Sequence, residues 1–106
     1  MQKFKGTRGP WRVSEMRGDL IDIRHSDEAI GAISLNLAHV VARKSWLSEA
    51  EANAKLIAAA PELLEACLRM RNQLQAAGYE AEKGSLNPTK CLLAQVEEAI
   101  GKALGQ

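Results

Sequence analysis

One stretch near the middle of the chain constrains the fold more than any other. Residues 52–66, Ala-Asn-Ala-Lys-Leu-Ile-Ala-Ala-Ala-Pro-Glu-Leu-Leu-Glu-Ala, consist almost entirely of residues that favour an α-helix. The exception is Pro61, which has no N–H to donate and whose ring crowds the carbonyl of Ile57. The stretch therefore predicts a pronounced bend at Pro61. The chain there is either one kinked helix or two successive helices, the second with proline at its first position.

The residues before this stretch show the alternation of apolar and polar side chains that is typical of half-buried β-strands. The runs that read as strands cover residues 11–14, 20–25 and 29–35. In the second run Ile21 and Ile23 should face one way, with Asp22 and Arg24 on the other side. The segment that continues to about residue 42 favours a further short strand. We therefore predict a three- to four-stranded antiparallel meander over about 11–42, with one face covered by a helix.

Start and stop signals divide the second half into helices. Ser48 with Glu51 three residues later has the spacing of a capping box, so a helix should begin at Ser48. Gly78 is a helix-ending residue, which gives a helical region of about 48–77 with its bend at Pro61.

Asn87 followed by Pro88 repeats a helix start, with a side-chain cap and a proline in the first turn. Apolar residues at helical spacing then indicate a last helix over about 88–104. The predicted fold is α+β: the meander packed on the proline-bent helix, plus the C-terminal helix. With 106 residues, the chain is expected to form a single domain over 1–106.

The amino-acid composition and net charge limit the classes of protein to which this chain can belong. Hydrophobic residues make up 46% of the chain, enough for a packed core. The net charge of +1 argues against a dedicated nucleic-acid binder, which usually carries a strong basic excess. No signal peptide is visible at the N-terminus, and no segment approaches the roughly 20 apolar residues of a membrane span. We therefore expect a cytoplasmic protein whose two cysteines are reduced and which has no membrane partner.

No group of residues in the sequence matches a known catalytic motif. His25 and His39 have no carboxylate or cysteine at metal-binding spacing. Cys67 and Cys91 lie in separate predicted helices and are expected to be small buried side chains. The sequence thus predicts no catalytic residues, no metal site and no cofactor, and favours a protein that is not an enzyme.

Five residues are the candidates for binding. Arg8 and Arg12 belong to a basic N-terminal lead-in that can meet phosphates or an acidic protein face. Trp46 lies in a predicted loop next to Arg43 and Lys44, and tryptophan and arginine are enriched at binding hot spots. The alternative for all five is an ordinary solvated surface.

Two stretches resemble a widespread set of small bacteriophage and prophage proteins. The first is Gly9-Pro10-Trp11-x-Val13, and the second is the helical stretch 52–66 itself, read as an Asn-Ala-(Arg/Lys)-Leu-Ile-Ala-Ala-Ala-Pro-Glu-Leu-Leu core. The resemblance covers roughly residues 6–75. The chain departs from the pattern at Thr7-Arg8, where Thr-Pro is usual, and in its longer strand-to-helix connection and its own C-terminal helix.

The resemblance implies a phage-encoded accessory protein in the cytoplasm of a bacterial host, with no functional residues to carry over. It favours a non-enzymatic inhibitor that binds a host anti-phage defence protein. One alternative is an oligomeric sponge that holds a nucleotide signal, for which Arg8, Arg12 and Trp46 are the candidate contacts. A second alternative is a nucleic-acid-binding regulator. A homo-oligomer fits the first alternative best.

Overall fold

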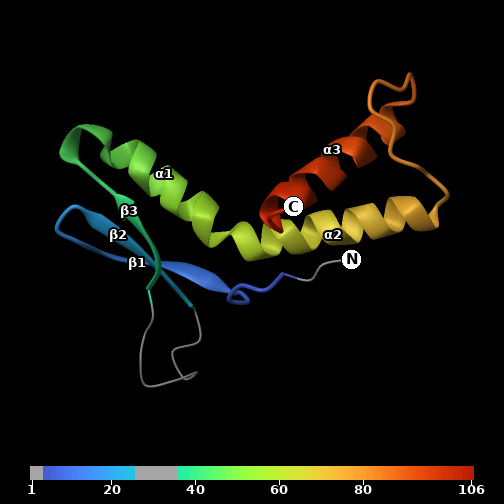
Figure 1. The fold of residues 1–106 in the computed structure, drawn as a ribbon. Helices are drawn as coiled ribbons and strands as arrows, with labels where there is room; N and C mark the ends of the chain where they lie inside the picture. Colours follow the sequence, from blue (N-terminus) through green and yellow to red (C-terminus); the bar gives the residue numbers. More distant parts are fainter. Residues whose placement is uncertain (1–3, 26–35) are drawn as a thin grey trace. The chain divides into compact units, whose positions relative to one another are not determined.

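The computed structural model describes residues 4–25 and 36–106, which form three β-strands followed by a short 3-10 turn and three α-helices (Figure 1). The α+β fold is therefore confirmed. The chain forms two compact units. We call residues 7–62 the sheet unit, and we call residues 4–6 with 63–106 the hairpin unit.

The sheet unit contains one three-stranded antiparallel sheet with the strand order β1-β2-β3. The strands are β1 (Trp11–Arg17), β2 (Leu20–His25) and β3 (Asn36–Val41). The last strand confirms the short strand that was predicted up to about residue 42. The strand predicted at 29–35 lies outside the described residues.

The first hairpin, between β1 and β2, has a two-residue turn. Arg17 pairs with Leu20, so only Gly18 and Asp19 form the turn, and Gly18 has a positive φ of 61°. Glycine adopts this conformation without strain, which suits a two-residue hairpin turn. Arg17 is the last residue of β1.

Helix α1 (Leu47–Ala58) lies across one face of the sheet (Figure 1). The core between them joins Ile21 and Ile23 to alanines of α1 that recur every four residues. These alanines are Ala50, Ala54 and Ala58. Because alanine has almost no side chain, the helix can lie close to the strands. Trp11 packs against this core.

The start of α1 differs from the prediction. A 3-10 turn over Lys44–Trp46 leads directly into α1, and Trp46 occupies the cap position. Ser48 is therefore already inside the first turn, where its hydroxyl is not placed to cap. The capping-box prediction was wrong because the tight turn starts the helix one residue earlier.

The helical stretch is interrupted at Ala59, where α1 ends and α2 (Ala60–Ala76) begins. The N–H of Ala59 donates to the carbonyls of Lys55 and Leu56, which closes α1. Pro61 then lies in the first turn of α2, where its missing N–H has no helical partner to lose. Of the two alternatives, the structure shows two successive helices, with the break two residues before the proline.

The hairpin unit consists mainly of α2 and α3 (Pro88–Ala103), two antiparallel helices joined by a loop over 77–87 (Figure 1). Asn87 Oδ1 accepts the N–H of Thr89 at 2.9 Å, which confirms the predicted cap. Gly78, with a φ of 93°, follows the end of α2 as expected. Three apolar residues of α3 are buried: Leu93, Val96 and Ile100.

Candidate interaction surface

Trp46 is the most exposed aromatic side chain among the described residues, with 65% of its surface accessible. It follows β3 through a tight turn in which its N–H donates to the carbonyl of Arg43 at 2.8 Å. The Arg43 side chain is also exposed. The turn therefore places a tryptophan and an arginine together at one end of the sheet. The side chain of Lys44 is outside the part of the structure that can be described.

An open hollow of about 570 Å³ lies beside this turn. Its lining comes from the end of β1, the β1–β2 turn, the two residues after β3 and the start of α1: Met16, Gly18, Asp19, Ala42, Arg43 and Leu47. The N–H of Ala42 donates to the carbonyl of Asp19 at 2.6 Å, which holds the two sides together. Half of the Met16 surface is accessible at the edge of this hollow. An adaptable apolar side chain of this kind suits a binding surface.

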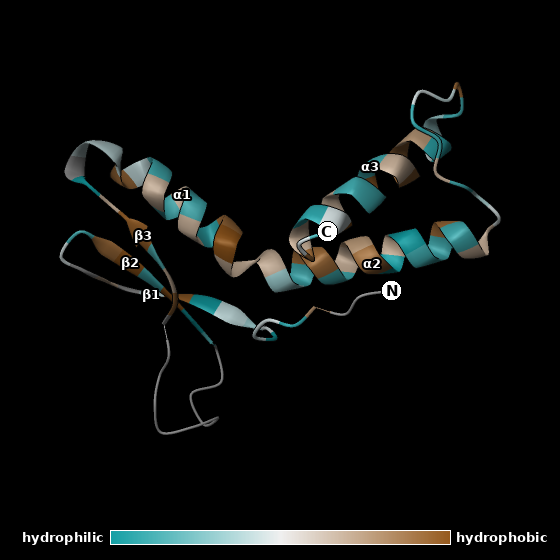
Figure 2. Cartoon of the chain, in the orientation of Figure 1, coloured by the Kyte–Doolittle hydropathy of each residue, from teal (hydrophilic) through white to brown (hydrophobic). Residues whose placement is uncertain are grey.

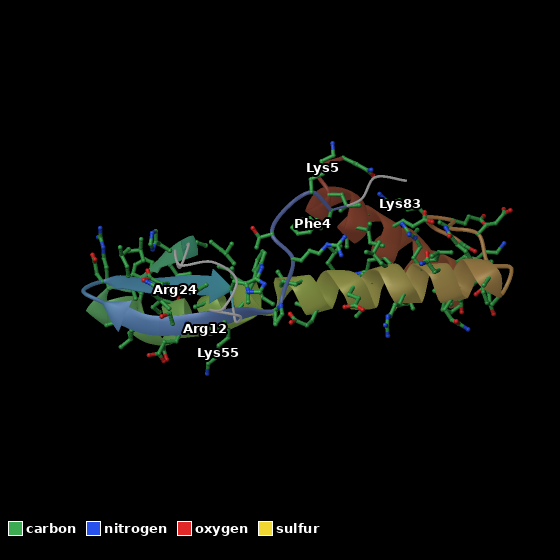
Figure 3. The ribbon with its side chains drawn as sticks, turned by 90° about the horizontal axis from the view of Figure 1, so that it is seen from below. Phe4, Lys5, Arg12, Arg24, Lys55 and Lys83 are labelled. Atoms are coloured by element: carbon green, nitrogen blue, oxygen red, sulfur yellow. The ribbon has the colours of Figure 1, made fainter. Side chains whose placement is uncertain are left out.

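A second hollow, of about 240 Å³, shares Met16 with the first. It lies between strand β1 and helix α1. Its lining residues are Val13, Ser14, Met16, Ile21, Glu51 and Lys55. Figure 3 labels Lys55 on α1 below the strands. The two hollows together follow β1 from its turn toward its middle.

The other two predicted binding residues lie at the opposite end of the sheet. Arg12 pairs across the strands with Arg24, near the start of β1 and the end of β2 (Figure 3). Ala42 and the turn with Trp46 adjoin the start of β2 instead. A strand rises about 3.3 Å per residue, so roughly 15 Å separate the two ends. Arg8, four residues before Arg12, is exposed. The five predicted residues therefore form two groups rather than one.

The sheet carries a hydrogen-bonded carboxylate and histidine that the sequence did not predict. Asp22 and His39 are direct cross-strand partners, and His39 Nδ1 lies 2.7 Å from Asp22 Oδ1. The Asp22 side chain is 1% exposed and that of His39 is 45% exposed. Arg24 Nη2 lies 3.6 Å from Asp22 Oδ2. A buried carboxylate thus holds two cationic or ionisable side chains on the sheet face away from α1.

The Asp22–His39 pair can still form a hydrogen bond with a further group. With its proton on Nδ1, His39 donates to Asp22, and its ring orientation is then set by a buried group. Its Nε2 is left as an acceptor, or as a donor when the ring is protonated. The described residues contain no group of three side chains that is suited to a metal ion. The pair is therefore a polar contact point beside the basic residues Arg12 and Arg24.

Comparison with known proteins places the chain in a family. A family model described as Salmonella phage P22 protein Y8K6 matches residues 1–106. The chain belongs to this phage protein family. No curated protein and no solved structure matches it. Over the part of the chain that the structure describes, no helix is both long enough and apolar enough to cross a membrane.

Sequence reasoning missed two parts of this phage protein's surface. Met16 was not singled out, because its exposure follows from the irregular pairing between Val13 and Met16, which interrupts the strand alternation. His39 was weighed only as a metal ligand and set aside. Its partner Asp22 lies 17 residues away, so the pairing register was needed to find it.

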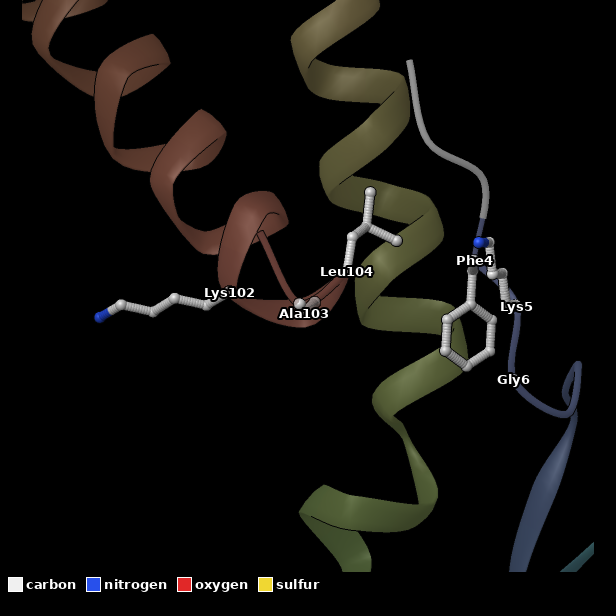
Figure 4. A pocket seen from close by; sticks show the side chains of 7 residues that line it. Phe4, Lys5, Gly6, Lys102, Ala103 and Leu104 are labelled. Carbon is white, nitrogen blue, oxygen red and sulfur yellow. The ribbon is translucent and has the colours of Figure 1, made fainter.

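A third hollow in the phage protein, of about 360 Å³, lies in the hairpin unit at the end of α3. Its lining includes Phe4, Lys5, Lys102 and Leu104, and Figure 4 shows Lys102 extending away from Phe4. Because its two lysines do not converge, this hollow lacks the convergent polar groups of a ligand site.

Proposed function

We propose that this phage protein is a non-enzymatic inhibitor that binds a component of the host's anti-phage defence directly. The observation that carries the proposal is the exposed Trp46 beside Arg43 and the hollow edged by Met16. Water-exposed tryptophan is unfavourable unless a partner covers it, and Trp and Arg dominate binding energy at protein interfaces.

The geometry fits a protein partner better than a small ligand. The hollow is open to solvent, whereas small-molecule sites usually enclose most of their ligand. Its lining combines the apolar Met16 and Leu47 with Arg43, and this mixture is typical of an interface centre and its rim. The family match supports action during phage infection of a bacterium.

The test is capture of a partner from a lysate of the bacterial host by the full chain. Trp46→Ala should lower the affinity for the captured protein by about 30-fold or more, as expected for a hot spot worth about 2 kcal/mol. Leu56→Ala is the matched control, because Leu56 is 63% exposed on α1 but lines neither hollow of the sheet unit. Equal loss in both variants, or no specific partner, would count against the proposal.

A second candidate is binding of a nucleotide signal. The observation that favours it is the placement of Arg12 and Arg24 on neighbouring strands, on the face that also carries His39. Guanidinium groups recognise phosphate oxygens well. Calorimetric titration with a cyclic dinucleotide tests it: binding that Arg12→Ala removes and Trp46→Ala leaves intact would favour this candidate over the first.

A further inference from the structure

Strand β3 lies at an edge of the sheet, so one of its long sides faces no other strand of the described chain. The sheet order is β1-β2-β3, which makes the outer sides of β1 and β3 the two edges. A strand edge presents backbone N–H and C=O groups that can pair with another strand. The alternation of hydrogen bonds in an antiparallel pair decides which residues of β3 present these groups.

The backbone groups of alternate residues in β2 point toward β3. Arg17 and Leu20 flank a two-residue turn, and such flanking residues bond to each other, so the groups of Leu20 point toward β1. Those of the next residue, Ile21, therefore point toward β3. The N–H of Ala42 donates to the carbonyl of Asp19, which agrees because Asp19 and Ile21 are two residues apart.

The same alternation sets the direction of the backbone groups in β3. Ile21 pairs with Val40, so the N–H and C=O of Val40 point toward β2. Those of His39 and Val41 therefore point away from the sheet. The 2.7 Å contact between His39 and Asp22 agrees, because side chains are closest in pairs whose backbones do not bond to each other. In the described part of the chain, no hydrogen bond reaches the outward groups of His39 and Val41.

The side chains of β3 suit contact with another apolar strand. Ala38 and Val40 pack against the core beneath α1 but are only half-buried, so part of their apolar surface stays accessible. Val41, on the other face of the sheet, is 57% exposed. The strand sequence NLAHVV contains no lysine, arginine, aspartate, glutamate or proline. Figure 2 shows apolar residues in β3.

The other edge strand, β1, has two features that oppose pairing. Its register with β2 shifts between Val13 and Met16, and an irregular strand is a poor template for a further strand. It also carries arginine at positions 12 and 17, and charged residues protect an edge. In β3 the pairing shifts only near its start, so residues 38–41 are regular and uninterrupted by such charges. The unprotected edge is therefore that of β3.

We propose that β3 pairs with β3 of a second copy of the chain, antiparallel and across a two-fold axis at Val40, so that the two sheets join into one continuous sheet. With the axis at Val40, His39 of each copy lies opposite Val41 of the other. Each such pair exchanges both of its backbone hydrogen bonds, which satisfies all the outward groups of these two residues. The contact is self-complementary, as a two-fold interface requires.

The side chains of the two copies also match in this register. On the side that faces α1, Val40 lies opposite Val40 of the other copy, and β-branched side chains opposite each other stabilise a sheet. This contact covers apolar surface that the half-buried core residues leave accessible. On the outer face, Val41 lies opposite His39. No lysine, arginine or carboxylate enters the contact.

The neighbouring axis positions fit less well. An axis at His39 would place two histidines opposite each other and would use Leu37, where the pairing of β3 with β2 shifts. An axis at Val41 would use Arg43, whose carbonyl is already bonded in the turn after β3. The axis at Val40 uses only residues of the regular strand.

The expected dimer is weak, because a few residues of each copy supply the contact. Small interfaces belong to weak and transient complexes. We therefore expect a dimer that forms at high protein concentration and dissociates on dilution.

The test is hydrogen exchange of the full chain at several protein concentrations, together with its mass by sedimentation. The amides of His39 and Val41 should exchange about tenfold more slowly when about nine in ten chains are paired than in dilute protein. The amide of Val40, which points toward β2 in both states, should stay protected throughout. The mass should rise toward twice the chain mass of 11.5 kDa over the same range.

A charge on the edge should separate the two copies. Val41→Lys should move dimer formation to at least about tenfold higher protein concentration, because lysine on an edge strand opposes pairing. Leu56→Lys is the matched control, because it adds the same charge at an apolar residue of α1 that is 63% exposed. It should leave the mass and the exchange unchanged. Circular dichroism checks that both variants are folded, and the exchange pattern of the unaltered chain tests the pairing without either variant.

Cysteine cross-linking tests the position of the axis. In a background without Cys67 and Cys91, Val40→Cys chains should form disulfide-linked pairs faster than Val41→Cys chains. The reason is that residue 40 lies opposite itself, whereas residue 41 is offset from its counterpart by two positions. Faster linkage of Val41→Cys would contradict the proposed register.

Three results would overturn the pairing of two copies. The first is a single mass at every concentration, or a dimer that Val41→Lys leaves unchanged. The second is protection of the His39 and Val41 amides that does not vary with concentration, which would show that the chain covers this edge itself. The third is protection that appears only when a host protein is added, which would assign the edge to a strand of that protein.

Discussion

The sheet unit and the hairpin unit bury their apolar side chains in different ways. In the sheet unit, α1 covers the sheet, and the alanines of the helix meet Ile21 and Ile23 in a two-layer core. In the hairpin unit, two helices form one layer with three buried apolar residues on α3. A two-layer unit buries its apolar side within itself, whereas a one-layer unit leaves an apolar side exposed. The first unit therefore buries its apolar side within itself, whereas the second leaves Leu63, Met70 and Leu92 exposed.

The two units also differ in how their buried charged side chains are bonded. Asp22 is held by His39 on the neighbouring strand and by Arg24 on its own, so its interactions tie β2 to β3. Arg71 is also buried, and its Nε and Nη2 both donate to Oδ1 of Asn72, the next residue in the chain. Both hydrogen bonds run between chain neighbours within α2, so they join no two elements. The sheet unit therefore gains cross-links from its buried charge, and the hairpin unit does not.

The largest effect should come from removing one core side chain in each unit. Ile23→Ala should lower the unfolding free energy of the sheet unit by about 2–5 kcal/mol, because Ile23 is fully buried and its loss leaves a cavity. Native-state hydrogen exchange should show the amides of β2 losing protection while those of α3 keep theirs. Leu93→Ala is the matched change in the hairpin unit and should give the reverse pattern. A uniform loss of protection across the chain in either variant would mean that the two units unfold as one.

A smaller loss of stability should follow from a substitution at Gly9. There the Gly-Pro-Trp stretch meets Pro61 of the helical stretch 52–66. A Cβ added at Gly9 would lie 2.6 Å from Cβ of Pro61, closer than two such carbons can approach. Gly9→Ala should therefore destabilise the sheet unit by about 1–3 kcal/mol, the usual cost of overpacking. Urea unfolding followed by the fluorescence of Trp11 and Trp46 measures this loss. Unchanged stability would show that the first stretch shifts away from Pro61 freely.

The smallest effect should have the opposite sign and belong to the hairpin unit. Gly101 lies inside α3, and a Cβ added there meets no atom within 4 Å. Gly101→Ala should stabilise α3 by about 0.5–1 kcal/mol, because alanine loses less backbone freedom in a helix. Thermal unfolding monitored by circular dichroism should show a higher midpoint. A lower midpoint would contradict the open space that the structure shows at this position.

Several elements could be predicted because their causes are local. The alternation in residues 20–25 placed Ile21 and Ile23 in the core, and Asn87 with Pro88 marked the start of α3. Local signals failed where a neighbouring turn competed with them. Ser48 has the spacing of a helix cap, but the tight turn ending at Trp46 begins the helix first.

The candidate surface was only partly predictable. The exposure of Trp46 and Arg43 followed from their place in a polar loop, and the structure has both exposed. Their separation from Arg12 could not be derived, because it depends on which end of β2 each segment adjoins. The hollow edged by Met16 depends on an irregular pairing within the sheet, which leaves no mark in the residue pattern.

The sequence by itself determined the elements of this protein: alternating strands, an alanine-rich helical stretch broken near Pro61, and a capped last helix. These follow from backbone sterics and from residues three or four positions apart. Only the tertiary structure decided that Gly9 abuts Pro61, that Asp22 meets His39, and that Leu63, Met70 and Leu92 stay exposed. The reason is physical: such contacts depend on strand register and helix rotation, which are set by the packing of the whole unit.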